Sequence, residues 1–133
     1  MSDIKYFNDS KGNILAILIP NDFTTNGINF ITKDDSYQQV AYMKHDSNHV
    51  ILPHYHNKIE RVVDLTTETL VIKKGNLEVV LYENNVELHR FIATSGDVLT
   101  LLSGGHGFTC LDEVEMIEIK QGPFLGANDK TRF

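Results

Sequence analysis

The sequence predicts an all-β protein of the jelly-roll type, in which many short antiparallel strands form a sandwich or a barrel. Three observations lead to this prediction. Short runs rich in β-branched and aliphatic residues recur along the chain, turn residues separate these runs, and little of the chain has a helical pattern. A jelly roll is an architecture that accommodates all of these strands.

The N-terminal part supplies three predicted strands. Residues 13–19 form an aliphatic run that Pro20 ends, and a turn-rich stretch leads from there to a short strand at 28–32. An Asp-Asp-Ser turn at 34–36 separates this strand from an extended stretch at 37–44. The 13–19 strand is very apolar for a sheet edge. We therefore expect a homodimer in which this strand, or its neighbour at 37–43, contacts the partner.

The strand predicted at 49–56 carries the most informative feature of the chain, the pair His54 and His56. Side chains two residues apart on a strand point to the same face, so both histidines face one way together with Leu52. Pro53 lies inside this run, which places the predicted strand near an edge or a bulge.

Strands dominate the rest of the chain. Residues 68–74 and 76–82 flank Gly75 and form either a hairpin or one bent strand. Four further strands are predicted at residues 86–92, 98–102, 107–111 and 114–120. The tail at 122–133 is predicted to be irregular.

Length and composition narrow the class of protein. A chain of 133 residues with 41% hydrophobic residues is expected to form one folded domain, 1–133. The net charge of −6 argues against binding to nucleic acid. Cys110 is the only cysteine and cannot form an internal disulfide. No signal-like or bilayer-spanning apolar run is found, so we expect a cytoplasmic protein that does not bind a membrane.

The histidine pair points to a metal site. Glu68 begins an aliphatic strand in phase with Leu70 and Ile72, so it is expected to point inward, where an unpaired carboxylate would be unfavourable. His106 follows two glycines, which allow a sharp turn. Three imidazoles and one carboxylate suit Zn, Fe, Ni, Cu or Mn and do not distinguish among them.

At this point the chain resembles the cupin superfamily. The first cupin motif contains a His-x-His pair and a later Glu-x6-Gly, which His54, His56, Glu68 and Gly75 match. Eleven residues separate His56 from Glu68, which is more than the motif has. Glu60 stands at the usual distance from His56 and is therefore the competing carboxylate ligand, although we favour Glu68 because its spacing to Gly75 is kept.

The second cupin motif is matched less completely. Gly96 and Gly104 stand at its glycine positions, but Leu102 replaces its proline, His106 comes one residue early, and the final asparagine is absent. The stretches around these motifs also resemble a subgroup of small single-domain bacterial cupins, which are associated with surface-polysaccharide and nucleotide-sugar gene neighbourhoods. The resemblance spans about residues 49–124, with N-terminal strands at 12–44 before it.

The resemblance implies a cupin-type double-stranded β-helix, a jelly-roll barrel, with one divalent transition metal in it. The implied ligands are His54, His56, Glu68 and His106. It also implies metal-dependent chemistry on a small polar, anionic metabolite such as a sugar derivative. Isomerisation or epimerisation is the first choice, dioxygenation is the second, and a non-catalytic small-molecule-binding module is the rival class.

Further candidate pocket residues are polar residues that share a strand face with apolar ones. Arg90 lies on the same strand face as Val86, Leu88 and Ile92, so we expect it to point into the barrel and bind an anion. The alternatives are an ion pair with an acidic residue such as Glu118, or an arginine that is simply exposed. Glu118 and Lys120 share a face with Met116 opposite Ile117 and Ile119, and the pattern does not say which face is interior. The candidate acid–base groups are Glu60, Glu118 and Lys120, and the candidate substrate-binding residues are Arg90, Arg61, Gln39 and Tyr42.

Overall fold

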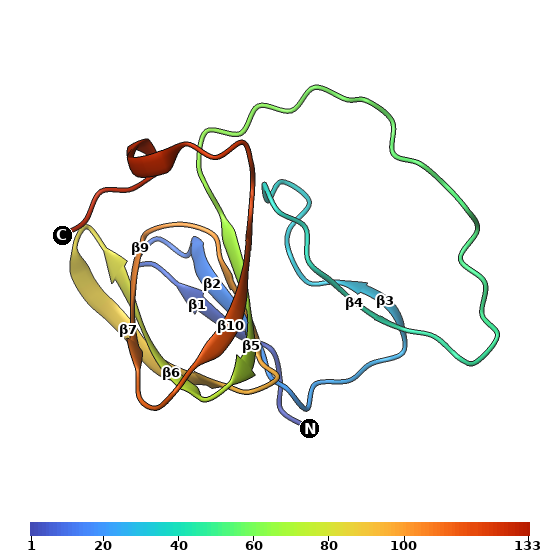
Figure 1. The fold of residues 1–133 in the computed structure, drawn as a ribbon, viewed down its shortest axis with the longest axis horizontal. Coiled ribbons are helices and arrows are strands. Elements are labelled where there is room, and N and C mark those ends of the chain that lie inside the picture. The colour runs from blue at the N-terminus through green and yellow to red at the C-terminus, as the bar shows by residue number, and fades with distance from the viewer. The chain divides into compact units, whose positions relative to one another are not determined.

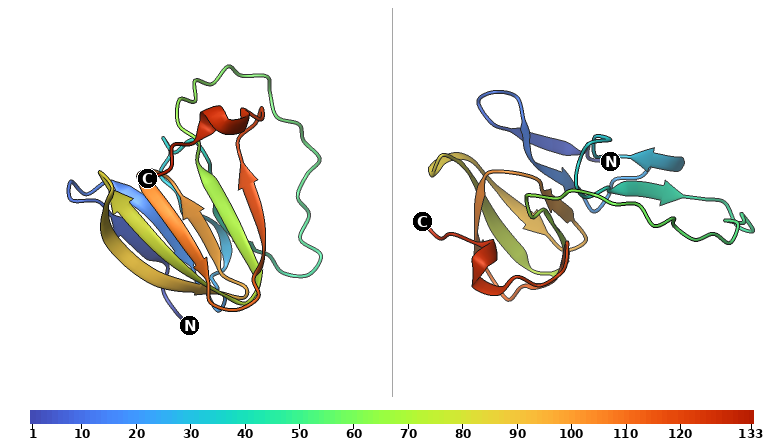
Figure 2. Two further views of the ribbon diagram at one scale, coloured as in Figure 1. Left: turned by 60° about the vertical axis from the view of Figure 1, so that its left-hand side comes forward. Right: turned by 90° about the horizontal axis from the view of Figure 1, so that it is seen from above.

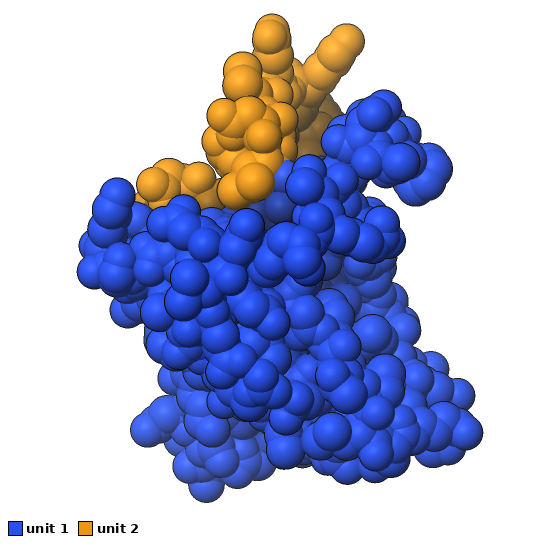
Figure 3. Space-filling view, turned by 90° about the vertical axis from the view of Figure 1, so that its left-hand side faces the viewer, with its two compact units in different colours: residues 1–23, 66–133 blue, residues 24–65 orange.

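The computed structural model describes residues 1–133, and the chain falls into two compact units (Figure 1). Unit 1 comprises residues 1–23 and 66–133, and unit 2 comprises residues 24–65, as the colours of Figure 3 show. Unit 1 contains β1, β2 and all strands from β5 onward, whereas unit 2 contains β3 and β4. The single domain over residues 1–133 stays a prediction.

A five-stranded antiparallel sheet forms one layer of unit 1 (Figure 2). Its strand order is β1-β2-β8-β5-β10, so β10 lies at one edge, and β2 lies between β1 and β8. The expectation that the 13–19 strand is a sheet edge is therefore wrong, because both of its sides are paired. The strands are β1 (Lys5–Asn8), β2 (Ile14–Ile19), β5 (Glu68–Lys74), β8 (Val98–Leu101) and β10 (Glu115–Lys120).

A three-stranded antiparallel sheet forms the second layer of unit 1 (Figure 2). Its order is β7-β6-β9, so β6 lies in the middle and β9 lies at an edge. The strands are β6 (Asn76–Glu83), β7 (Val86–Thr94) and β9 (Gly105–Cys110).

The core of unit 1 lies between the two sheets. Leu18, Leu70 and Leu99 come from the five-stranded sheet, and Leu77 and Leu81 come from the other, and all belong to one cluster of buried side chains. Burying such a side chain is worth about 1.5–3 kcal/mol, so this cluster holds the layers together. The alternation of these residues along each strand fixes which side chains point inward.

Gly75 lets the chain pass from one sheet to the other. β5 and β6 belong to different sheets, so the two stretches around Gly75 form a bent strand and not a hairpin. The φ angle of Gly75 is 87°, and a Cβ atom there would lie 2.2 Å from the carbonyl oxygen of Glu113. No residue with a side chain fits this bend without movement of the backbone.

Unit 2 contains a two-stranded antiparallel sheet of β3 (Gly27–Phe30) and β4 (Ala41–Lys44). No strand is present between residues 45 and 67, so the strand predicted at 49–56 is wrong. Pro53 interrupts this stretch, since it lacks a backbone N–H and fixes its own φ angle. β1 is a strand that the sequence pattern did not reveal.

The fold is all-β, as predicted, with antiparallel sheets arranged as a β-sandwich in unit 1. The strands do not form a closed barrel. In unit 1, both sheets end in strands near the candidate site, β9 and β10, which each have one unpaired edge.

Candidate functional site

Two of the expected metal ligands meet inside unit 1. Glu68 is the first residue of β5 and is 8% exposed, and His106 is the second residue of β9. The Nε2 atom of His106 lies 3.5 Å from the Oε2 atom of Glu68. A carboxylate from one sheet therefore faces an imidazole from the other.

The strand phase explains why both side chains point inward. Glu68 alternates with Leu70 and Ile72, which are 2% and 1% exposed, as the sequence pattern predicted. His106 stands opposite Leu81 in the β6–β9 register, and Leu81 belongs to the core. Residues opposite each other on antiparallel strands share a face, so His106 points toward the core side of its sheet.

The register between β5 and β10 settles which face of β10 is interior. Lys120 stands opposite Glu68, and Glu118 stands opposite Leu70. Glu118 and Lys120 therefore lie on the inner face, and Lys120 Nζ is 3.8 Å from Glu118 Oε2. Ile117 and Ile119 occupy the outer face and are each 49% exposed. Four titratable groups thus lie on inward-facing positions: Glu68, His106, Glu118 and Lys120.

The surroundings of Glu68 favour its charged form. The hydrogen bond from His106 lowers the pKa of the Glu68 carboxyl, and partial burial opposes this change. The charge of His106 when its imidazole is protonated, a hydrogen bond with Glu118 and the positive charge of Lys120 lower the pKa of Glu68 further. Glu68 is therefore a carboxylate near neutral pH, which is the form that ligates a metal or accepts a proton.

His54 and His56 lie in unit 2, next to each other on the stretch without strands. Their ring centroids are 5.5 Å apart, and the rings are nearly perpendicular, with an interplanar angle of 74°. The Nδ1 atom of His54 lies 2.8 Å from the carbonyl oxygen of Leu52. If Nδ1 donates this hydrogen bond, Nε2 of His54 is the nitrogen with a free lone pair.

The remaining candidates of unit 2 differ in their surroundings. Glu60 and Arg61 are exposed and belong to the same stretch as the histidines. The Gln39 side-chain amide donates to the carbonyl oxygens of Lys33, Asp34 and Ser36, so it closes the loop between β3 and β4. The Tyr42 hydroxyl lies 3.4 Å from Thr24 Oγ1. The contacts of Gln39 within its own loop give it a structural role.

The expectation that Arg90 points into the barrel is wrong. Its guanidinium donates to Glu78 at 2.7 Å and to Glu87 at 2.5 Å, and its side chain is 50% exposed. The inner face of β7 carries Phe91, which packs on the core, and the buried Ala93. Arg90 is thus an exposed, ion-paired arginine, and Glu78 and Glu87 are its partners, not Glu118.

The metal ligands expected from the sequence divide into two pairs. Glu68 and His106 converge in unit 1, and His54 and His56 are neighbours in unit 2. Within either unit, no group of three or more His, Cys, Asp or Glu side chains converges in a way that could hold a metal ion. The donor chemistry of the Glu68–His106 pair still fits a metal, because both atoms that face each other are of ligand type.

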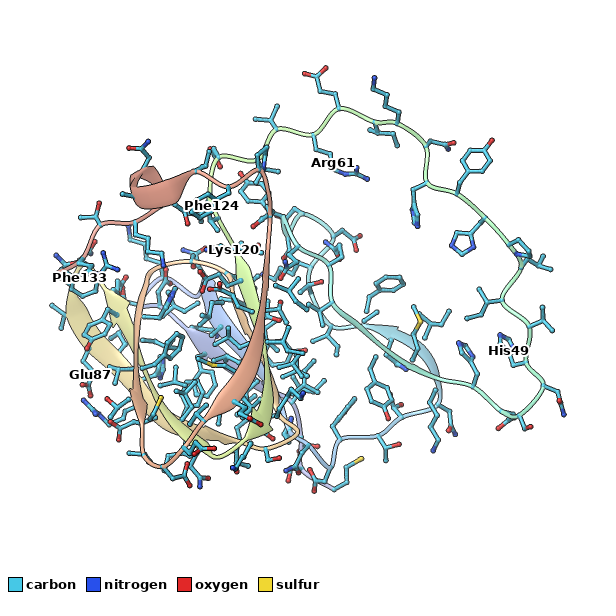
Figure 4. All side chains as sticks on the ribbon, viewed as in Figure 1. His49, Arg61, Glu87, Lys120, Phe124 and Phe133 are labelled. Atoms are coloured by element: carbon cyan, nitrogen blue, oxygen red, sulfur yellow. The ribbon has the colours of Figure 1, made fainter.

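The C-terminal segment forms a cavity that sequence reasoning missed. Its volume is about 300 Å³, and Lys120, Lys130 and Arg132 are among the residues that line it. The segment includes the short 3-10 helix η1 (Gly126–Asp129) and crosses the end of unit 1 where β5 begins and β10 ends (Figures 1 and 2). Figure 4 shows Lys120 and Phe124 at this end. A cluster of cations in the tail of an acidic chain was the available signal.

Comparisons of the chain with models of protein families, with curated proteins and with solved structures found no match. The structure has no helix that combines the length and the apolar character needed to cross a membrane.

Proposed function

We propose that this chain binds one divalent transition metal through His54, His56, Glu68 and His106, as its resemblance to cupins implies. The observation that carries the proposal is the Glu68 carboxylate, which is 8% exposed and faces His106 Nε2 at 3.5 Å. A carboxylate that is removed from water needs a partner, and a cation shared with the imidazole is one.

The histidine pair supports the same ligand set. A histidine that binds a metal usually donates its other ring N–H to a carbonyl or a carboxylate, which fixes the ring. The contact of His54 Nδ1 with the Leu52 carbonyl oxygen has this form and leaves Nε2 for the metal. The ring centroids of His54 and His56 are 5.5 Å apart, so both imidazoles can bind the same ion.

We further propose that the two-layered sandwich of unit 1 is a jelly roll of the cupin type. β10 is an edge strand of the five-stranded sheet and β9 is an edge strand of the three-stranded sheet, and each has one unpaired side. A double-sheet jelly roll leaves strand edges of this kind open, whereas a closed barrel would pair them.

The reaction we propose is isomerisation or epimerisation of a small polar, anionic metabolite such as a sugar derivative. Such a reaction moves a proton, so it needs groups that can accept and donate one. Glu118 and Lys120 lie on the same inner face as Glu68 and supply these groups. When bound, a divalent metal polarises a carbonyl or hydroxyl oxygen of the substrate.

Metal analysis tests the proposal. We expect about one transition metal per chain in the purified protein, and a loss of metal in the His54→Ala, His56→Ala double variant. Unchanged metal content in this variant would refute the ligand set.

A matched pair of variants tests the carboxylate. Glu68→Gln should weaken metal binding in a chelator competition more than Glu60→Gln does, because Glu68 lies next to His106. The reverse order would identify Glu60 as the ligand.

A further inference from the structure

The cavity beneath the C-terminal segment combines free cations with a defined shape. Lys130 and Arg132 line it and form no ion pair with any carboxylate. Lys120 lines it as well; its side chain is 27% exposed, and its Nζ atom lies 3.8 Å from Glu118 Oε2. Three cations therefore line one cavity in a protein whose net charge is −6. Such a cluster repels itself unless an anion is present.

The polar groups around the cavity are already engaged. The hydroxyl of Thr66 donates to Asp129 Oδ1 at 2.5 Å, and the Gln121 side chain exchanges two hydrogen bonds with Thr67. Asp129 is the only acidic residue among those that line the cavity, so its lining carries a net positive charge. The anion-binding capacity of Lys130 and Arg132 is thus left unused by the protein itself.

The segment is held in place at its far end. The ring of Phe133 packs edge-on against Tyr82, with centroids 5.1 Å apart. It also fills the space beside Gly105, where a Cβ atom would lie 2.7 Å from the ring. Contacts at Asp129 and at Phe133 therefore fix the segment that carries Lys130 and Arg132, and the cavity is a preformed one.

We propose that this cavity is an anion-binding site, in which Lys120, Lys130 and Arg132 bind an oxyanion group such as the phosphate of a small metabolite. Its volume of about 300 Å³ is at the lower end of the range for small-molecule sites. Phe124 and Leu125 supply apolar contact surface beside the cations. An arginine fork and two ammonium groups suit an oxyanion because they form charge-assisted hydrogen bonds with it.

The cavity also adjoins the candidate metal ligands, because Lys120 both lines it and stands opposite Glu68. We therefore assign an anion held here to the substrate of the proposed metal site, because Lys120 pairs with the strand end that carries Glu68. This assignment rests on the proposed function, whereas the anion site itself does not.

The test is calorimetric titration of inorganic pyrophosphate into chelator-treated protein at constant ionic strength. Metal removal separates this experiment from the metal proposal, so either can fail alone. We expect wild-type protein to bind pyrophosphate and the Lys130→Ala, Arg132→Ala variant to bind it at least about tenfold more weakly, as the loss of charge-assisted hydrogen bonds predicts.

A charge-matched control is Lys5→Ala, Lys73→Ala, which removes two exposed cations elsewhere in unit 1. It should bind within about twofold of wild type, since bulk electrostatics alone contribute little at moderate salt. Absence of binding to wild type, or an equal loss in the control variant, would overturn the proposal.

Gly105→Ala provides a second variant that keeps all three cations. The new methyl group displaces the Phe133 ring, a movable side chain, so the protein should fold while the segment loses its anchor. We expect weaker pyrophosphate binding than in wild type. Unchanged binding, with Phe133 shown to be displaced by its altered NMR signals, would contradict the preformed site.

Discussion

Gly75→Ala tests the bend that joins the two sheets of unit 1. Alanine at φ 87° is in the left-handed region, which costs about 1–2 kcal/mol. Its Cβ would also lie 2.2 Å from the Glu113 carbonyl oxygen and 2.7 Å from Asp112 Oδ1. Relieving this overlap requires backbone movement, for which about 1–3 kcal/mol is typical. The free energy of unfolding should therefore fall by about 2–5 kcal/mol.

Gly12→Ala is the matched control for this prediction. Gly12 has a similar φ of 84°, but no heavy atom lies within 4 Å of its added Cβ. It should lose only the conformational part, about 1–2 kcal/mol. Urea unfolding followed by circular dichroism measures both variants. Equal losses would refute the reasoning, because the overlap at Gly75 would then contribute nothing.

Four further predictions follow from the same structure. Leu77→Ala should lower the unfolding free energy by about 2–5 kcal/mol in urea melts, because Leu77 is fully buried. Arg90→Ala should leave the urea unfolding midpoint nearly unchanged, and metal content and pyrophosphate binding unchanged, since its ion pairs are exposed. The hydrogen bond from the backbone N–H of Asn76 lowers the pKa of the Asp112 carboxyl in the folded protein. The charged carboxylate therefore stabilises the fold above its unfolded pKa, and this stabilisation is lost as pH falls through the lower folded pKa. Asp112→Asn lacks this carboxylate, so its stability should fall less on acidification than that of wild type. Light scattering should give a dimer mass, because the two-stranded sheet of unit 2 has unpaired edges.

Most strands could be predicted because each combines a short apolar run with clear turn residues. The strand at Glu68–Lys74 begins and ends where the pattern placed it, and its period of two correctly directed Glu68 inward with Leu70. The two glycines before His106 singled it out as a candidate, and the structure places it 3.5 Å from Glu68. Such local patterns depend only on strand geometry, so they can be recognised in the sequence without knowledge of the tertiary structure.

Arg90 shows where the same reasoning fails. Three apolar residues share the strand face of Arg90, and all are exposed: Val86 (64%), Leu88 (40%) and Ile92 (53%). The apolar face of this strand is therefore its outer face. Alternation reveals that a strand has two faces, but it cannot say which of them is buried when both carry apolar residues. The same ambiguity for Glu118 and Lys120 was resolved only by the register with β5.

The stretch at 49–56 and the C-terminal cavity could not be predicted, for different reasons. The first has the alternation of a strand, but a strand also needs a paired neighbour, and alternation carries no information on pairing. The cavity depends on the contacts of Asp129 and Phe133 with residues more than twenty positions away in the sequence. Tail residues without a periodic pattern give no sign of such contacts.

X-ray absorption spectroscopy of the metal-loaded protein tests the central claim most directly, because it counts the ligands around the metal. The proposed set predicts three imidazole nitrogens and one carboxylate oxygen at about 2.0–2.2 Å from the ion. His106→Ala should remove one imidazole from this count. A spectrum without imidazole ligands, or one that is identical in wild type and His106→Ala, would contradict a metal held jointly by the histidine pair and the Glu68–His106 pair.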